Sequence, residues 1–345
     1  MPDGERKRGR GLRLAPAVAA AALPVVGTLA ACDPDRPRPF ALATGTTAGI
    51  YYPLGGALAS RWTRDLPGLV VKAEVSAGSV TNLIQVAKGE SDIGFSQADA
   101  VTDAIAGTGR FPTALPIRVL ARIYPNVVHL LSVAGRGVES PSDLPGKRVS
   151  LGPPGSGNEV TARNVLRALG IADRDFRVRH MNYNQSINGL KDGTLDAVFL
   201  AAGLGVSSVI ELGLTRELRL VPFSGGEIAA VEAANPAYQG FSVPPGVYRG
   251  VDEPTLTPSL WNMLVVHADM PDELAAALAA SLLAGREEFF SVTRNAEFIR
   301  LDNVASVGGL PLHPGAARHY REEREAVIPG EAHAEPGGAA VAIRP

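Results

Sequence analysis

The sequence predicts an α/β protein of two lobes, each lobe a mainly parallel sheet flanked by helices. Short apolar or β-branched runs alternate with helical segments, the order typical of parallel sheets. The same order returns in the second half of the chain, which indicates an approximate duplication. The chain has 345 residues, 46% of them hydrophobic, so it can bury a sizeable core. Its net charge of −2 gives no reason to expect a nucleic-acid partner.

Residues 1–32 are predicted to be an export signal. A basic start is followed by residues 14–31, which carry no charge and contain two prolines. Such a run suits a signal peptide better than a membrane-spanning helix. It ends in Leu29-Ala30-Ala31-Cys32, which resembles the lipobox of bacterial lipoproteins, and Cys32 is the only cysteine. We expect Cys32 to be lipidated; the alternative is a plain signal peptide cleaved nearby. The Pro-rich residues 33–39 should form a tether.

Residues 40–133 are expected to form the first part of lobe 1. A helix should run to about residue 65, and Ser79 is a suitable N-cap for another. Gln97 and Asp99 follow a buried strand, where they should open into a cleft. The strands of this part are predicted at residues 40–42, 69–75 and 92–96.

Residues 134–243 are expected to form lobe 2 with the same order of elements. The two halves have similar residues where a helix leads into a buried strand. They are Ser79, Asn82, Gly89 and Asp92 in the first half and Ser186, Asn188, Gly193 and Asp196 in the second. The strands are predicted at 148–151, 177–181 and 196–200, and the helices at 160–169 and 186–191.

Residues 244–325 are expected to return to lobe 1. A strand is predicted at 264–267, and Pro271 should introduce one long helix over 272–290. Residues 326–345 are rich in Gly, Ala and Pro without an apolar period, so we expect a disordered tail.

The turn at residues 43–55 is the first half of a candidate binding site. Gly45 and Gly49 let the backbone turn tightly, and Thr46 and Thr47 place hydroxyls beside the free N–H groups of a helix start, where an anion is favoured. Tyr51 and Tyr52 have the best claim among the tyrosines near turns, which also include Tyr124 and Tyr183. The alternative is an ordinary Gly-rich connection between a strand and a helix.

The turn at residues 152–159 is the second half. Gly152 and Gly157 have the spacing of a phosphate-binding P-loop, but Asn158 and Glu159 replace its Lys and Ser/Thr, which excludes nucleotide hydrolysis. A helix start with Ser156 remains, and Gly155 and Gly157 would allow close approach of a ligand. Ser79 and Gln97 are secondary candidates.

The sequence offers recognition rather than bond-breaking. The six histidines form no metal-ligand cluster, and the Gly-x-Ser-x-Gly motif of serine hydrolases is absent. His129 lies in an apolar run, where we expect a hydrogen-bonded core histidine. We therefore expect no metal, no cofactor and no catalytic residue.

These motifs resemble the TAXI solute receptors, the binding proteins of TRAP transporters. The matching pieces run in family order from about residue 40 to 322. They are the turn at 43–55, residues 89–95 with Gln97 and Asp99, the turn at 152–159, residues 193–197, Gly246-Val247-Tyr248, and Pro311-Leu312-His313-Pro314-Gly315-Ala316. Ala48 and Gly203-Leu204-Gly205 depart from the family pattern near the expected cleft, so ligand identity is not carried over. His313 is expected to be structural.

The resemblance implies a periplasmic-binding-protein fold of type II with ligand between the lobes. It also implies a receptor for a small acidic solute, a glutamate-like amino acid or a dicarboxylate, delivered to a TRAP permease. The protein would be extracytoplasmic and lipid-anchored to the outer face of the cell membrane, or periplasmic. The alternatives are a binding protein of an ABC importer, a ligand sensor for a membrane kinase, and an enzyme acting on a small acid. Arg122 and Arg163 are available to neutralise the solute, and nothing local decides between them.

Overall fold

The computed structural model describes residues 39–47 and 49–327, whose strands form one ten-stranded sheet. The strand order is β2-β1-β3-β10-β4-β7-β5-β6, with β9 paired to β10 and β8 paired to β4. The predicted signal segment 1–32 with Cys32, the tether up to residue 38 and the tail from residue 328 lie outside the described residues. Within the described part, no helix is long and apolar enough to cross a membrane.

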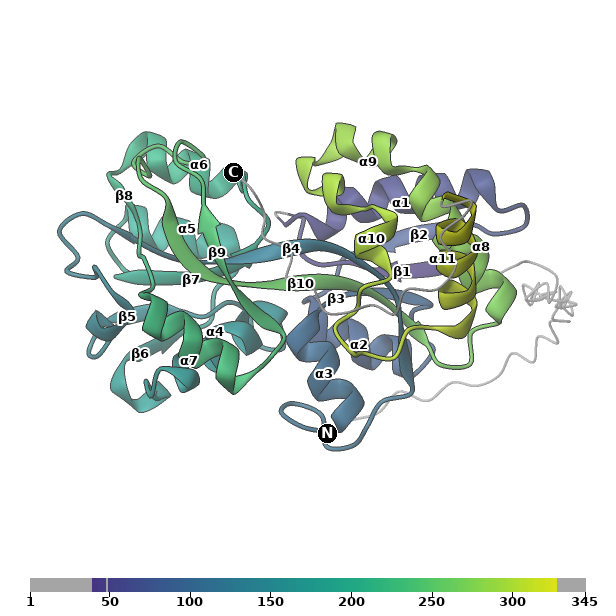
Figure 1. Ribbon diagram of the computed structural model, residues 1–345. Helices are drawn as coiled ribbons and strands as arrows, with labels where there is room; N and C mark the ends of the chain where they lie inside the picture. Colours follow the sequence, from purple (N-terminus) through teal and green to yellow (C-terminus); the bar gives the residue numbers. More distant parts are fainter. Residues whose placement is uncertain (1–38, 48, 328–345) are drawn as a thin grey trace, which may run out of the picture. The chain divides into compact units, whose positions relative to one another are not determined.

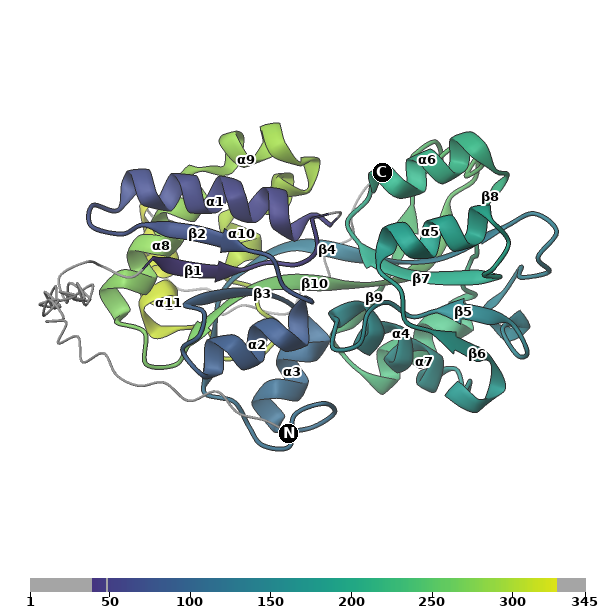
Figure 2. The same cartoon turned by 180° about the vertical axis from the view of Figure 1, so that it is seen from behind.

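Lobe 1 is built around three parallel strands, β1, β2 and β3. The helix α1 covers one face of these strands, and α2 and α3 cover the other (Figures 1 and 2). The elements are β1 (Phe40–Ala43), α1 (Tyr51–Asp65), β2 (Val71–Glu74), α2 (Ser79–Ala87), β3 (Ile93–Gln97) and α3 (Ala98–Ala106).

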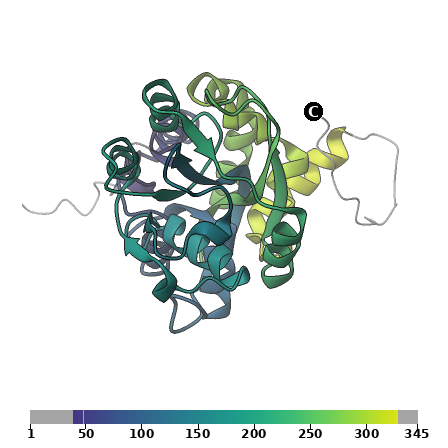
Figure 3. The same ribbon diagram turned by 90° about the vertical axis from the view of Figure 1, so that its left-hand side faces the viewer.

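Lobe 2 repeats this plan with the parallel strands β6, β5 and β7. Figure 3 views the structure from the side of lobe 2 and shows helices on both sides of the lobe 2 strands. The elements are β5 (Arg148–Ser150), α4 (Gly157–Ala168), β6 (Arg177–Arg179), α5 (Tyr183–Lys191), β7 (Ala197–Ala202), α6 (Ser207–Thr215), β8 (Leu218–Leu220), α7 (Gly225–Ala234) and β9 (Tyr238–Val243).

Two long antiparallel strands, β4 (Ile117–Val133) and β10 (Thr255–His267), join the lobes (Figure 1). In lobe 1, β3 pairs with β10, and in lobe 2, β7 pairs with β4. The register between β4 and β10 shifts between Trp261, opposite Pro125, and Met263, opposite Arg122. Proline cannot donate to a strand ladder, so such an irregularity is where a sheet tolerates it. The two strands form a hydrogen-bonded link that bends beside Pro125.

The C-terminal elements pack on lobe 1. The helix expected over 272–290 is two helices, α8 (Asp272–Ala284) and α9 (Arg286–Val292), so the prediction of one long helix is wrong. Gly285 lies between them, and a Cβ there would collide with Arg61 and Phe289. The described part of the chain ends with α10 (Leu301–Val304) and α11 (Pro314–Val327). His313 is buried before α11, its ring bonded to the Met270 carbonyl at 2.9 Å, a structural role as expected.

Buried apolar side chains fall into four clusters, and β4 contributes to both lobes. Leu120 and Ile123 belong to a cluster with α1 and α8 side chains, whereas Val128 and Leu130 belong to one with α4 side chains. Tyr248, which lies after β9, packs in a lobe 2 cluster. We therefore propose that the lobe boundaries, expected at residues 133 and 243, fall inside β4 and β10.

Two asparagines tie strand ends in a similar way, but they are not the pair that the expected duplication aligned, since Asn188, the expected counterpart of Asn82, is exposed on α5. Asn82 of α2 donates to the carbonyls of Thr44 and Phe95, at 2.6 and 2.8 Å, and so ties the ends of β1 and β3 together. Asn158 of α4 donates in the same way to Leu151 and Phe199, at 2.8 and 2.9 Å. Such bonds satisfy backbone carbonyls that would otherwise be buried without a partner.

The aspartates of the repeated steps also play matching roles. Asp92 accepts the N–H of Ala41 at 2.8 Å, and Asp196 accepts the N–H of Arg148 at 2.9 Å. Each carboxylate thus bonds the first residues of the neighbouring parallel strand. His129 is buried and bonded to Tyr248 and to backbone carbonyls, as expected for a core histidine.

Candidate functional site

A cavity of about 70 Å³ lies where residues from both lobes meet. A buried water molecule needs about 10–15 Å³ of such volume, so the cavity has room for several waters and suits a small solute. Lobe 1 contributes the turns before α1 and α2 and the end of β3, and lobe 2 contributes the turns before α4 and α5 and the end of β7. Tyr124 and Asn126, on either side of Pro125 in β4, complete the lining.

Eight of the ten ligand-binding residues predicted from the sequence line this cavity. They are Gly45, Thr46, Gly49, Tyr51, Ser79, Gln97, Ser156 and Gly157. The other two, Thr47 and Gly155, are not among the lining residues. The side chain of Thr47 is exposed, and the N–H of Gly155 donates to Glu159 at 2.9 Å. The predicted set is therefore brought together, with two members placed outside.

Four helices begin at this cavity. Their first residues, Tyr51 of α1, Ser79 of α2, Gly157 of α4 and Tyr183 of α5, all line it. The first N–H groups of a helix lack partners within the helix and carry the positive end of its dipole. Because two of these starts come from each lobe, the cavity can bind an anion with backbone groups of both lobes.

The helix caps limit which side chains are free. Ser156 is the N-cap of α4: its hydroxyl accepts the N–H of Glu159 and donates to the carbonyl of Pro153 at 2.7 Å. The Ser156 hydroxyl proton is therefore already used within its own turn. The prediction that Ser79 is an N-cap is wrong. Gly78 takes that place with a φ of 108°, and the Ser79 hydroxyl accepts the N–H of Gln97 at 3.1 Å.

Gly157 is the point where the lobes approach most closely around the cavity. A Cβ built on Gly157 would overlap the side chains of Gln97 and Ser79 from lobe 1. Only a residue without a side chain fits between them.

Five polar side chains outside the predicted set also line the cavity, those of Tyr124, Asn126, Asn158, Asn182 and Tyr183. Tyr124 and Tyr183 had been singled out as aromatic candidates, while Tyr52 lies outside the lining. Asn126 and Asn182 were missed. Asn182 follows the predicted strand at 177–181 and caps α5, so its place after a strand was a usable signal. Asn126 lies within a strand that the sequence reasoning did not identify.

The described residues that line the cavity carry no formal charge. Burial raises the pKa values of Tyr51, Tyr124 and Tyr183, so these phenols stay neutral. The two arginines considered from the sequence lie elsewhere. Arg122 covers the ring of Trp261 at 4.0 Å and donates to the carbonyl of Asn303 at 3.0 Å. Its burial lowers the pKa to about 10.

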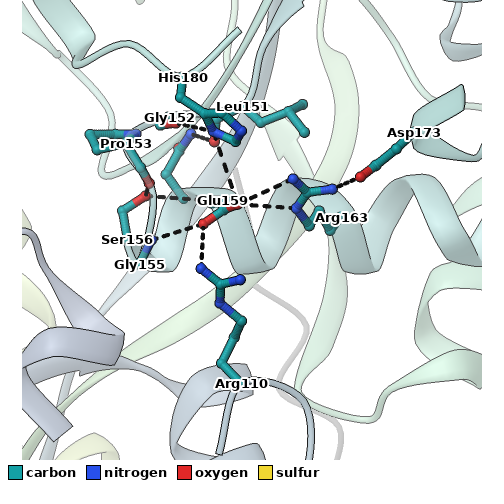
Figure 4. A network of polar contacts seen from close by, with 11 residues as sticks. Arg110, Leu151, Gly152, Pro153, Gly155, Ser156, Glu159, Arg163, Asp173 and His180 are labelled. Atoms are coloured by element: carbon teal, nitrogen blue, oxygen red, sulfur yellow. Dashed lines mark hydrogen bonds and ion pairs between the residues drawn. The ribbon is translucent and has the colours of Figure 1, made fainter. Parts of the chain in front are cut away.

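Arg163 belongs to a network around the buried carboxylate of Glu159 (Figure 4). Glu159 also bonds Gly155 of its own turn and Arg110 of lobe 1, the latter at 3.3 Å, and Arg163 continues to Asp173. Arg110, Glu159 and Arg163 line a second cavity instead of the first. Glu159 therefore does not present its charge to the candidate site. It ties the 152–157 turn to lobe 1.

Asp99 does not reach the cavity, although it was expected to open into the cleft. Its fully buried carboxylate accepts hydrogen bonds across the lobe contact from Thr161 at 2.9 Å and Tyr238 at 2.6 Å. Burial raises the pKa of this carboxyl more than the bonds from Tyr238, Thr161 and Ala100 lower it. Thr161 also donates to Gln97 at 3.1 Å, so this contact adjoins the cavity.

No group of three or more His, Cys, Asp or Glu side chains that could hold a metal ion occurs among residues 39–47 and 49–327.

With this geometry established, comparison with known proteins assigns the family. The model of the NMT1-like family matches residues 42–323. The chain belongs to this family. The match covers both lobes, both turns of the candidate site and the joining strands.

Solved structures similar to this NMT1-like chain include proteins described as transporters and a substrate-binding protein of a transporter. One described as a periplasmic transporter has 12% identity and a TM-score of 0.50, over 83% of this chain and 95% of that one. A putative L-cystine ABC transporter from Listeria monocytogenes has 14% identity and a TM-score of 0.47, over 75% and 94%. An amino acid ABC transporter substrate-binding protein from Streptococcus pneumoniae, bound to L-arginine, has 16% identity and a TM-score of 0.44, over 74% and 92%. The fold is that of periplasmic solute-binding proteins, as predicted.

Replacing Gly157 with Ala should hold the lobes apart. The added methyl would overlap Gln97 and Ser79, so we expect solute affinity to fall at least about tenfold, or about 1.4 kcal/mol. Calorimetric titration measures the affinity, and thermal melting without solute should change little. The matched control is Gly225→Ala, also at the first position of a helix, where a Cβ would meet nothing within 4 Å. Equal affinity in the Gly157 variant would contradict a closing contact there.

Replacing Asp99 with Asn should change how stability depends on pH. A carboxyl whose pKa is raised by folding binds its proton more tightly in the native state than in the unfolded state. Its contribution to the free energy of unfolding is therefore largest at a pH below the ordinary pKa of about 3.9. That contribution is lost as pH rises through the raised pKa. Urea unfolding between about pH 4 and 7 should therefore show the wild type losing free energy of unfolding relative to Asp99→Asn.

The control for this measurement is Asp192→Asn, an exposed aspartate at the end of α5 in lobe 2. Parallel pH curves for the wild type and Asp99→Asn would show that the buried carboxyl does not titrate in this range.

Proposed function

We propose that this chain is an extracytoplasmic receptor that binds a small carboxylate in the cavity between its lobes and delivers it to a membrane permease. The observation that carries the proposal is the meeting of four helix starts, two from each lobe, on one cavity. Each start offers unpaired N–H groups and a partial positive charge, and a carboxylate accepts hydrogen bonds from such groups.

Closure of the lobes around the solute is the proposed mechanism. The turns that face each other come from both lobes, so a bound anion would bond to both at once. Gly157 leaves room for the lobes to meet. Two contacts between the lobes, that of Asp99 with Thr161 and that of Arg110 with Glu159, hold them together outside the cavity. Thr46 is the proposed side-chain donor, and Gly45, Gly49, Ser79, Gln97 and Ser156 form the surrounding wall.

The membrane partner is proposed to be an ABC importer, the kind of system to which the Listeria and Streptococcus neighbours are assigned by name. A TRAP permease, implied by the TAXI resemblance, is the rival. Uptake that depends on ATP hydrolysis would support the first, and uptake that depends on an ion gradient would support the second.

A binding role is proposed over an enzymatic one. The NMT1-like chain has the fold of solute-binding proteins, and the described residues lining the cavity include no charged side chain for acid or base catalysis. Turnover of a bound acid by the purified protein would favour an enzyme, and a response of a membrane kinase without uptake would favour a sensor.

The carboxylate assignment predicts that small organic acids raise the melting temperature of the purified protein and that Thr46→Val reduces this shift. A ligand at a hundredfold excess over its dissociation constant stabilises the folded state by about 2.7 kcal/mol. Loss of the Thr46 hydroxyl should weaken binding about five- to tenfold, since one hydrogen bond contributes about 1 kcal/mol. The melting temperature without ligand should stay close to that of the wild type.

The matched control is Thr47→Val, the neighbouring threonine, which is exposed and outside the cavity lining. It should bind like the wild type. If no acid shifts the midpoint while a cationic solute does, the carboxylate assignment is wrong. If both threonine variants bind normally, Thr46 is not part of the site.

Lipid anchoring through Cys32 is proposed from the lipobox resemblance of residues 29–32. In a bacterium that processes lipoproteins, Cys32→Ser should move the protein from the membrane fraction to the soluble extracytoplasmic fraction, as measured by fractionation and immunoblotting. Continued membrane attachment of the variant would count against acylation of Cys32.

A further inference from the structure

We infer that the solute carries one carboxylate, an N–H donor and no second negative charge, and that Asn126 recognises the N–H group. This inference rests on the proposed function and narrows it. The class it selects is a neutral amino acid or a carboxylate with an amide group. It rejects the dicarboxylates and the glutamate-like acids that the sequence allowed.

Asn126 lines the cavity and is only 3% exposed. Its Nδ2 atom donates to the carbonyl of Ala201 at 3.3 Å, whereas its Oδ1 atom has no hydrogen-bond partner within the described part of the chain. Turning the amide over would set Oδ1 against the carbonyl of Ala201, two acceptors facing each other, so the Ala201 carbonyl fixes the orientation.

Three other polar side chains of the cavity lining already have hydrogen-bond partners. The hydroxyl of Tyr51 donates to Asn262, and that of Tyr183 donates to Ala201. Asn158 bonds the ends of β5 and β7. These three side chains are therefore committed, and the Oδ1 atom of Asn126 is left as an unused acceptor on a residue of the cavity wall. A buried acceptor without a partner costs free energy, and a ligand N–H would remove that cost.

The charge of the cavity lining favours a solute with a single carboxylate. The four helix starts provide partial positive charge for one carboxylate, but none of the described lining residues is an arginine, lysine or histidine. A second carboxylate would be buried without a cation, which is strongly unfavourable. An amino acid with an uncharged side chain, by contrast, brings no net charge into an uncharged wall.

The test is a calorimetric titration of the purified protein with pairs of acids. Each pair matches a neutral amino acid, or a carboxylate with an amide group, with the monocarboxylate of the same chain length that lacks nitrogen. The pairs are alanine with propionate and glutaramate with valerate. We expect at least one nitrogen-bearing member to bind ten times or more tightly than its partner, a difference of about 1.4 kcal/mol. Glutamate and the dicarboxylates should bind more weakly than that member.

The variant Asn126→Leu tests the residue itself. It should reduce the preference for nitrogen-bearing acids to about threefold or less, while affinity for a plain monocarboxylate such as propionate is kept. The fold should tolerate it, because the Ala201 carbonyl retains the bond from Tyr183. The control is Asn184→Leu, an exposed position on α5, which should keep the wild-type preference.

The outcomes separate this inference from the proposed function. If propionate and valerate both bind as tightly as their nitrogen-bearing partners, or if Asn126→Leu keeps the preference, the inference is overturned while the carboxylate receptor stands. If no acid of either kind binds, the proposed function fails, and the inference fails with it.

Discussion

The pairing of β4 with β10 is the interaction on which the rest of the structure depends. Both strands continue from one lobe into the other, and the parallel strands of each lobe are attached to one of them, β3 to β10 and β7 to β4. The lobes are therefore parts of one hydrogen-bonded sheet. Their relative movement has to come from small changes in backbone dihedral angles along two paired strands, so the axis of movement is fixed by the sheet.

The site lies where this arrangement places helix starts opposite each other. In a parallel strand–helix unit the strand's carboxyl end leads into the helix's first turn, and ligands of α/β proteins bind at that edge of the sheet. Asn82 and Asn158 hold the strand ends of the two lobes in the same way, each through a side chain bonded to two backbone carbonyls. Each lobe thus contributes two helix starts to the cavity, and the unlike residues Thr46 and Asn182 line it from lobe 1 and lobe 2.

Local sequence determined much of this site. The glycines and threonines of the 43–55 turn and Ser156 with Gly157 act through bonds and contacts within a few residues, so the pattern alone predicted their place. Asn126 could not be found in this way, because its role depends on Ala201 in β7. The strand that holds it was also missed: Pro125 interrupts an apolar run that has no helical or alternating period, and only its pairing with β10 makes it a strand. Ser79 failed as a cap because Gly78 adopts a positive φ that the sequence does not reveal.

The irregularity beside Pro125 has a mechanical consequence. Tyr124 and Asn126, the residues on either side of this proline, form part of the cavity wall, so the wall and the bend of β4 share one stretch of backbone. A solute that binds Asn126, as proposed, would therefore act on the strand beside one of its register shifts, with no intervening chain of contacts. The proposed recognition and the proposed movement would then be connected by the covalent backbone itself.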